Sequence, residues 1–243
     1  MSLFKNPGRR AGFLYLLVIG APLRLIYIPA KLIVRGDAAA TANNLVTNEF
    51  LFRLGMFADL FTGAAVIFMT FAFYDVFKRV NRRLATLLVL LGGVLPSALY
   101  FANIGTDAAA LALARGGGGV LTAQGANVLS VFEQPQREAL MMLFLHVHNQ
   151  MVNAAQIFWG VWLLPLAILI WSSRFLPRFI AVWLTVNGLA YVAMSVADFL
   201  WPAYAGRISN ILFPALLGEL ILMLWLMIRG VNMEKWKHAN EQS

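Results

Sequence analysis

Long apolar segments, separated by short polar ones, dominate the hydrophobic pattern along the chain. A helix needs about 20 apolar residues to cross the hydrocarbon of a bilayer. Six segments have this length and predict six membrane-spanning helices: Ala11–Pro29, Glu49–Phe77, Leu84–Ile104, Ala139–Trp171, Phe179–Leu200 and Ile208–Ile228. The second and fourth segments are longer than a bilayer requires, so we expect them to tilt or to project beyond it.

Proline interrupts three of the predicted helices, at Pro96, Pro165 and Pro214. Each proline predicts a kink, because it removes one backbone donor inside the helix. Kinks of this kind are tolerated in membranes where neighbouring helices satisfy the freed backbone groups.

The composition supports a membrane protein. The chain has 243 residues, of which 60% are hydrophobic and only 12% are charged, whereas about 25% of the residues of a soluble domain are charged. It contains no cysteine, which excludes a disulfide scaffold and thiolate metal sites. We therefore predict an all-α integral membrane bundle that forms a single domain over residues 1–243.

The net charge of +8 is interpreted as a topology signal and not as a nucleic-acid footprint. With six spans, twelve of the 19 Lys and Arg residues fall on one side of the membrane and five on the other. The remaining two, Arg24 and Arg53, lie at or inside the membrane boundary. Because basic residues are retained in the cytoplasm, both termini are predicted to be cytoplasmic.

The first and second outer loops are the longer ones, and we expect short interfacial helices in them. Asp37 is a candidate N-cap for a helix that begins at Ala38. The loop from about Arg115 to Arg137 starts with four glycines, which predict a hinge or linker because no P-loop lysine and hydroxyl follow them. Five apolar residues of this loop predict an interfacial or re-entrant segment: Val120, Leu121, Val128, Leu129 and Phe132.

Several charged residues lie within the predicted spans. Each costs about 2.5–3.5 kcal/mol at the centre of a membrane helix on insertion scales, so it is expected to face a cavity or a partner. Arg53 has Glu49 one turn before it and can pair with it at i,i+4. Glu219 lies near the middle of the sixth span, where a charge is most costly. The other such residues are Arg24, Asp59 and Asp198, and Asn103 and Asp107 close the outer end of the third span.

The fourth span carries a polar stripe. His146, Asn149, Gln150 and Asn153 have the spacing i, i+3, i+4 and i+7, so they share one helix face, which is expected to face the bundle interior. His148 is predicted to point elsewhere, roughly 200° around the helix. Together with the charged residues, the stripe predicts a polar pocket that opens to the outer side and has its floor near Glu219.

Four ordered motifs carry a resemblance to a known family. They are Leu32–Thr41, Leu51–Gly55 followed by Ala58-Asp59-Leu60, Phe175–Arg178 and Pro214–Leu220. In these motifs the chain resembles the bacterial six-span family catalogued as domain of unknown function 4386. The resemblance implies the six-span fold, its topology and a location in the bacterial cytoplasmic (inner) membrane. It also matches His146 and Asp198 to a helix-four histidine and a helix-five acidic residue of that family, and it implies no activity.

The first hypothesis for function is the binding or transport of a small polar or amphiphilic ligand. Arg53 would hold an anionic group, and the carboxylates would accept cationic or proton-donating groups. The predicted site residues are Arg53, Asp59, His146, Asn149, Asn153, Asp198 and Glu219. The expected partners are this ligand and membrane lipids, with no nucleic acid, and the oligomeric state is left open.

The second hypothesis is a metal-dependent intramembrane hydrolase that acts on a lipid or an amide. His146, Asp59, Asp198 and Glu219 supply the nitrogen and oxygen ligands that zinc or another divalent metal uses, with an open position for water. No His-Glu-x-x-His spacing is present. The third hypothesis is a structural bundle, in which these polar groups only specify packing or pair with a partner.

Overall fold

The computed structural model describes residues 5–18, 23–116 and 129–241, and within these ranges all regular structure is helical. Five helical segments are long and apolar enough to cross a membrane: Glu49–Phe77, Arg82–Ala114, Gln134–Ser173, Arg178–Leu200 and Pro202–Ile228. They correspond to the last five predicted spans. The chain is therefore an all-helical, multi-pass membrane protein.

The first predicted span is described only in part. It contains α1 (Pro7–Leu17), a π-helical turn η2 (Leu23–Tyr27) and α3 (Ile28–Leu32). Residues 19–22 lie outside the described residues. A sixth span, and the side of the membrane on which the termini lie, stay predictions.

The described chain divides into two compact units built from interleaved segments. Unit 1 contains Met1–Val18, Gly63–Ala98 and Asn153–Ser243, and unit 2 contains Ile19–Thr62 and Leu99–Val152. Three boundaries fall inside continuous helices, namely α5 (Glu49–Phe77), α7 (Leu95–Ala114) and α9 (Gln134–Val161). Composition does not change at these points, so the sequence shows no boundary there.

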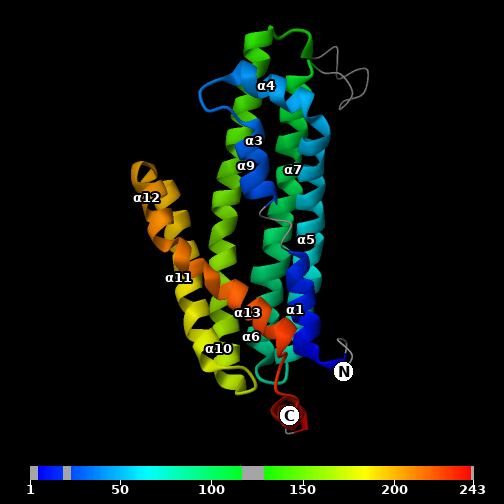
Figure 1. Ribbon diagram of the computed structural model, residues 1–243, viewed down its shortest axis with the longest axis vertical. Coiled ribbons are helices and arrows are strands. Elements are labelled where there is room, and N and C mark those ends of the chain that lie inside the picture. The colour runs from blue at the N-terminus through cyan, green and yellow to red at the C-terminus, as the bar shows by residue number, and fades with distance from the viewer. Residues whose placement is uncertain (1–4, 19–22, 117–128, 242–243) are drawn as a thin grey trace. The chain divides into compact units, whose positions relative to one another are not determined.

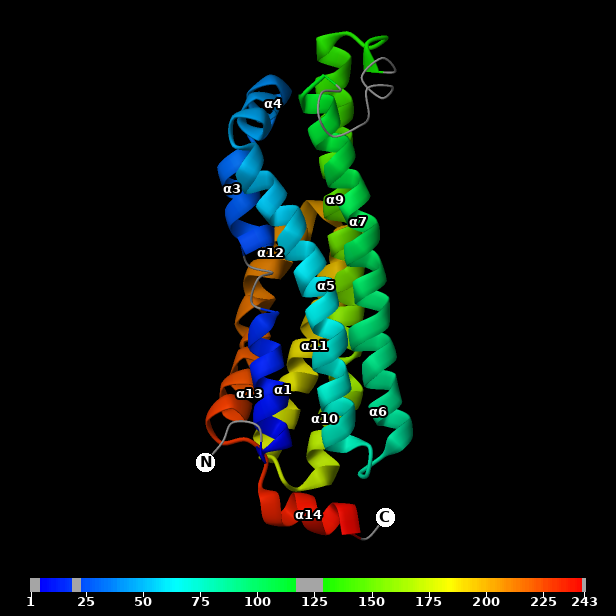
Figure 2. The same cartoon turned by 90° about the vertical axis from the view of Figure 1, so that its right-hand side faces the viewer.

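Unit 1 contains most of the shorter helices (Figures 1 and 2). Its core is aromatic: the Tyr15 ring meets the edge of Phe73 at 5.9 Å between centroids and Trp162 at 6.1 Å. Both Phe73 and Trp162 are buried. Besides α1 and parts of α5, α7 and α9, its elements are α6 (Arg82–Leu88), η3 (Val89–Val94), α10 (Leu163–Ser173), α11 (Arg178–Leu200), α12 (Pro202–Leu212), η4 (Phe213–Leu216), α13 (Leu217–Ile228) and α14 (Met233–Glu241).

Helix geometry changes at each of the three prolines that predicted kinks. The π-helical η3 ends two residues before Pro96, and the 3₁₀-helical η4 contains Pro214. Pro165 cannot donate to the carbonyl of Val161, where α9 ends. In each case the missing N–H removes one i→i−4 bond of the helix.

Two glycines allow α9 and α11 to pack closely within unit 1. A Cβ built on Gly188 would lie 2.7 Å from the carbonyl oxygen of Gly160, and a Cβ on Gly160 would overlap the carbonyl oxygen of Gly188. Small residues at helix crossings are typical of membrane bundles, where close van der Waals packing stabilises the association.

Unit 2 contains η2, α3, α4 (Ala38–Thr47) and the remaining parts of α5, α7 and α9. Its core includes the buried side chains of Ile28, Leu45 and Leu111. The Asp37 carboxylate accepts a hydrogen bond of 2.8 Å from Ala40 N, which confirms the predicted N-cap of α4. Most of the glycine-rich loop, including Val120, Leu121 and Val128, lies outside the described residues, so the interfacial segment stays a prediction.

Candidate functional site

One face of α5 brings an acidic side chain into the interior of unit 2. Phe52, Gly55, Asp59 and Thr62 follow one another at intervals of three and four residues, so they share a helix face. All four are buried, and the Asp59 residue is 4% exposed. Asp59 therefore needs a partner from another element, because an unpaired buried charge is strongly unfavourable.

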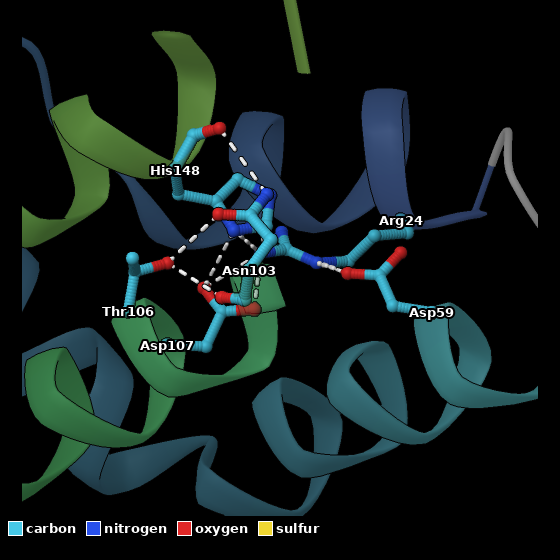
Figure 3. Close-up of polar contacts among 6 residues, drawn as sticks. All are labelled: Arg24, Asp59, Asn103, Thr106, Asp107 and His148. Carbon is cyan, nitrogen blue, oxygen red and sulfur yellow. Dashed lines mark hydrogen bonds and ion pairs between the residues drawn. The ribbon is translucent and has the colours of Figure 1, made fainter. Parts of the chain in front are cut away.

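Arg24, on η2, supplies that partner. Its Nε donates to Asp59 Oδ2 at 3.1 Å, and its Nη2 donates to Asp107 Oδ1 and Oδ2 at 2.8 and 2.7 Å. The guanidinium thus joins two carboxylates from two different helices, as Figure 3 shows. Hydrogen bonds between two ionised groups are among the strongest in proteins.

Asp107 and His148 complete the arrangement from α7 and α9. His148 Nδ1 lies 3.2 Å from Asp107 Oδ1, and its Nε2 lies 2.9 Å from Arg24 Nη2. Asn103, one turn before Asp107 on α7, donates from Nδ2 to the backbone oxygen of His148 at 3.2 Å. Asn103 in turn accepts a 3.0 Å bond from the Thr106 hydroxyl at its side-chain oxygen. These bonds fix α7 against α9 at the level of the charges.

We name Arg24, Asp59, Asp107 and His148 the Arg24 cluster. All four residues are at most 5% exposed, and Asp107 is fully buried. With both carboxylates ionised, the cluster has two negative charges and one guanidinium charge. A bound cation would balance the second carboxylate.

The lack of a side chain at Gly55 leaves room for Arg24 beside α5. A Cβ built on Gly55 would lie 2.5 Å from Ile28 Cδ1 and 3.1 Å from Arg24 Cδ. The guanidinium carbon lies 5.9 Å from the centre of the Phe52 ring, within the range of a cation–π contact. A glycine at this position therefore lets the Arg24 side chain lie directly against α5.

Three members of the Arg24 cluster have the chemistry of metal ligands. Asp59, Asp107 and His148 each offer one ligand atom, and these atoms lie within 4.8 Å of one another. Arg24 Nη2 contacts Asp107 and His148 directly, so the guanidinium already takes the place of a cation beside them. A metal ion would have to displace it.

Four of the predicted site residues lie in unit 2, namely Arg53, Asp59, His146 and Asn149. Only Asp59 belongs to the Arg24 cluster. Arg53 Nε donates to Glu49 Oε1 at 2.6 Å on the exposed side of α5, which confirms the i,i+4 pair, and Arg115 Nη1 reaches the same oxygen at 2.7 Å. His146 and Asn149 are exposed, although the polar stripe was expected to face the interior.

In unit 1, Glu219 has phenolic partners. The Tyr15 hydroxyl donates to Glu219 Oε1, and the Tyr191 side chain also hydrogen-bonds this carboxylate. Glu219 lies in the first turn of α13, just after the break at Pro214, and its backbone N–H donates to Asn187 Oδ1 at 3.0 Å. The described partners of this carboxylate are therefore neutral hydroxyl donors and not cationic side chains.

The other two predicted residues of unit 1 are partly buried. The backbone oxygen of Asn153 accepts a hydrogen bond of 2.6 Å from the Ser195 hydroxyl, so this part of α9 is fixed to α11. Asp198, near the end of α11, has no ion pair among the described residues. Of the four residues predicted to hold a metal, only Asp59 lies in a group of candidate ligands within the described chain.

Comparisons with known proteins gave a single family. A model described as Domain of unknown function (DUF4386) matches residues 10–230, which include the whole Arg24 cluster. No curated protein and no solved structure matched the chain. Because the family model covers most of the chain, this membrane protein belongs to the family of the domain of unknown function DUF4386.

Proposed function

We propose that the chain binds, and in the course of function transports, a small polar or amphiphilic ligand at the Arg24 cluster. The observation that carries the proposal is the sharing of one guanidinium by two buried carboxylates. A single Arg–Asp pair would suffice to hold two helices together. The second carboxylate adds a negative charge that favours a ligand with a cationic or hydrogen-bond-donating group.

A second feature of the same helix face supports a ligand site. The Thr62 hydroxyl, one turn beyond Asp59, is buried and has no hydrogen-bond partner among the described residues. Buried polar groups are nearly always satisfied by protein, water or another molecule. A polar ligand or a water that accompanies it would satisfy this hydroxyl.

The test compares two variants of the purified chain in neutral detergent. Arg24→Gln/Asp59→Asn/Asp107→Asn removes every formal charge of the three residues at once, so no unpaired buried charge destabilises it. Arg53→Gln removes an exposed arginine and serves as the control. Guanidinium, ethylammonium and choline are added to each protein, and the melting temperature is measured.

At least one of these cations is expected to stabilise the wild type and Arg53→Gln but not the triple variant. A ligand at 100 times its Kd adds about 2.7 kcal/mol to the free energy of unfolding. Equal shifts in all three proteins, or no shift in any, would overturn the proposal. The structural hypothesis predicts the latter result.

The close approach of Asp59, Asp107 and His148 favours a metal-dependent hydrolase as the second candidate. In that case Arg24 would leave the centre of the cluster, and zinc would take its place and activate a water. Zinc content after purification without chelator distinguishes the candidates. Loss of stoichiometric zinc in folded His148→Ala, but not in His146→Ala, would support the hydrolase, whereas zinc-free wild type would reject it.

A further inference from the structure

A basic cleft lies at one end of unit 1, far in sequence from the Arg24 cluster. It has a volume of about 670 Å³, which lies in the usual range for small-molecule sites. Four cationic side chains line it, namely Arg174, Arg178, Arg229 and Lys235, and none of its lining residues is acidic. None of the four forms an ion pair with a carboxylate among the described residues.

The walls of the cleft are held in place by hydrogen bonds to their backbone groups. Asn232 N donates to Phe175 O at 3.0 Å and joins the loop after α10 to the loop after α13. The buried Asn6 side chain donates to Val231 O at 3.0 Å and accepts from Val231 N at 3.2 Å. The cleft is therefore built into the fold and does not depend on side-chain positions alone.

Arg174 has an unusual backbone for an arginine. Its φ of 59° is the only positive φ of a non-glycine residue in the described chain, and it follows the C-terminus of α10. Glycine is favoured at such positions, because a side chain is strained there. An arginine at this position is explained if its charge is required in the cleft.

The N-terminus of α11 adds to the positive potential. Pro177 precedes this helix of 23 residues, and no side chain caps its first N–H groups. Free N–H groups and the helix dipole favour an anion at such an end. Together with the four cationic side chains, they favour an anionic ligand with several oxygen atoms.

The cleft lies where three candidate membrane spans end. The spans Gln134–Ser173 and Pro202–Ile228 finish beside it, and Arg178–Leu200 begins there. The ends of membrane-spanning helices lie at the level of the lipid headgroups. Exposed apolar side chains continue from the cleft along the spans, among them Phe179 at 52% and Ile228 at 66% exposure.

We propose that this cleft binds the phosphate of an anionic phospholipid headgroup, with the acyl chains along the exposed apolar residues below it. Basic pockets between membrane helices are a recurrent form of such lipid recognition. Basic residues that only determine the topology must lie in the cytoplasmic loops, but they need not gather around one cavity. The four cations of the cleft do line one cavity. A free phosphate has the same oxygen chemistry, so the experiment must separate the two sources.

The full chain in neutral detergent is titrated with dioctanoyl phosphatidylglycerol, and the bound lipid is counted by native mass spectrometry. Arg174→Gln/Arg229→Gln removes one cation from each wall of the cleft. Arg229→Gln/Lys235→Gln leaves the strained Arg174 backbone unchanged and serves as a second test. Arg82→Gln/Arg83→Gln is the matched control, because it removes two exposed charges outside the cleft.

Each cleft pair is expected to weaken lipid binding about 30-fold, and the control less than about threefold. Glycerol 3-phosphate and inorganic phosphate are expected to bind far more weakly than the lipid. Equal losses in the cleft and control variants, or no loss in the cleft variants, would overturn the site. Binding of the soluble phosphates as tight as that of the lipid would reject the lipid as occupant.

Discussion

Replacing Arg24 by glutamine tests whether the Arg24 cluster is a strongly coupled buried network. The side chain makes three hydrogen bonds to carboxylate oxygens, between 2.7 and 3.1 Å. Without the guanidinium, Asp59 and Asp107 remain buried with no arginine between them. Breaking a buried pair by removal of one partner costs about 3–5 kcal/mol, chiefly because the remaining charge is not compensated.

The assay is unfolding of the purified protein by SDS in mixed micelles, followed by circular dichroism. Arg53→Gln is the matched control: its ion pair with Glu49 is exposed, and Glu49 keeps its second bond to Arg115. Exposed ion pairs contribute about 0–1 kcal/mol. The expected difference between the two variants is therefore at least about 2 kcal/mol.

The neutral triple variant Arg24→Gln/Asp59→Asn/Asp107→Asn separates the value of the network from the cost of an unpaired charge. Replacing a whole buried ion group by hydrophobic side chains of similar volume is often neutral for stability, because no charge is left unpaired, and the amides of the triple variant also leave none. The triple variant should therefore recover most of the stability that Arg24→Gln loses. An Arg24→Gln protein as stable as Arg53→Gln would refute this reasoning, because it would show that the carboxylates do not depend on the guanidinium.

Two further predictions concern single side chains and use the same unfolding assay. Asn187→Leu removes the acceptor of the part-buried Glu219 N–H and should cost about 1–3 kcal/mol, as expected for a donor left unsatisfied. The exposed Asn149→Leu should change stability by less than about 0.5 kcal/mol, and equal effects of the two substitutions would contradict the role assigned to Asn187. Gly55→Ala places a methyl group against Ile28 and Arg24 and should cost about 1–3 kcal/mol. At Gly105 on α7 the added methyl group of an alanine would have no neighbour within 4 Å, so Gly105→Ala should stabilise the helix by about 0.5–1 kcal/mol. A loss of stability in this variant would contradict the open surroundings of Gly105.

Local features of the fold could be predicted from the sequence because they depend on neighbouring residues. The five described spans follow from the length of apolar segments, and the changes of helix geometry follow from the prolines. The cap at Asp37 and the Glu49–Arg53 pair have the same local origin. The division into two units was not predicted, because its boundaries lie within α5, α7 and α9.

The choice between the two histidines of α9 shows a limit of helical periodicity. The spacing of His146, Asn149 and Asn153 indicates that they share a face, but it does not indicate which face is inside. In a soluble helix the apolar stripe marks the interior, whereas in a membrane helix lipid-facing residues are apolar as well. The buried residues Met141 and Leu145, spaced with His148, lie on the interior side, and the sequence does not distinguish them from lipid-facing residues.

Charge balance is the signal that could have identified the Arg24 cluster. The predicted spans contain two arginines, and Arg53 has a partner on its own helix. Arg24 has none within a helical turn, so its partner must come from another helix, and few carboxylates are available. Asp59 and Asp107 are separated from it by 35 and 83 residues, which no local pattern encodes. Because both arginines of the predicted spans have other partners, none is left for Glu219. Its partners are the neutral phenols of Tyr15 and Tyr191 in unit 1.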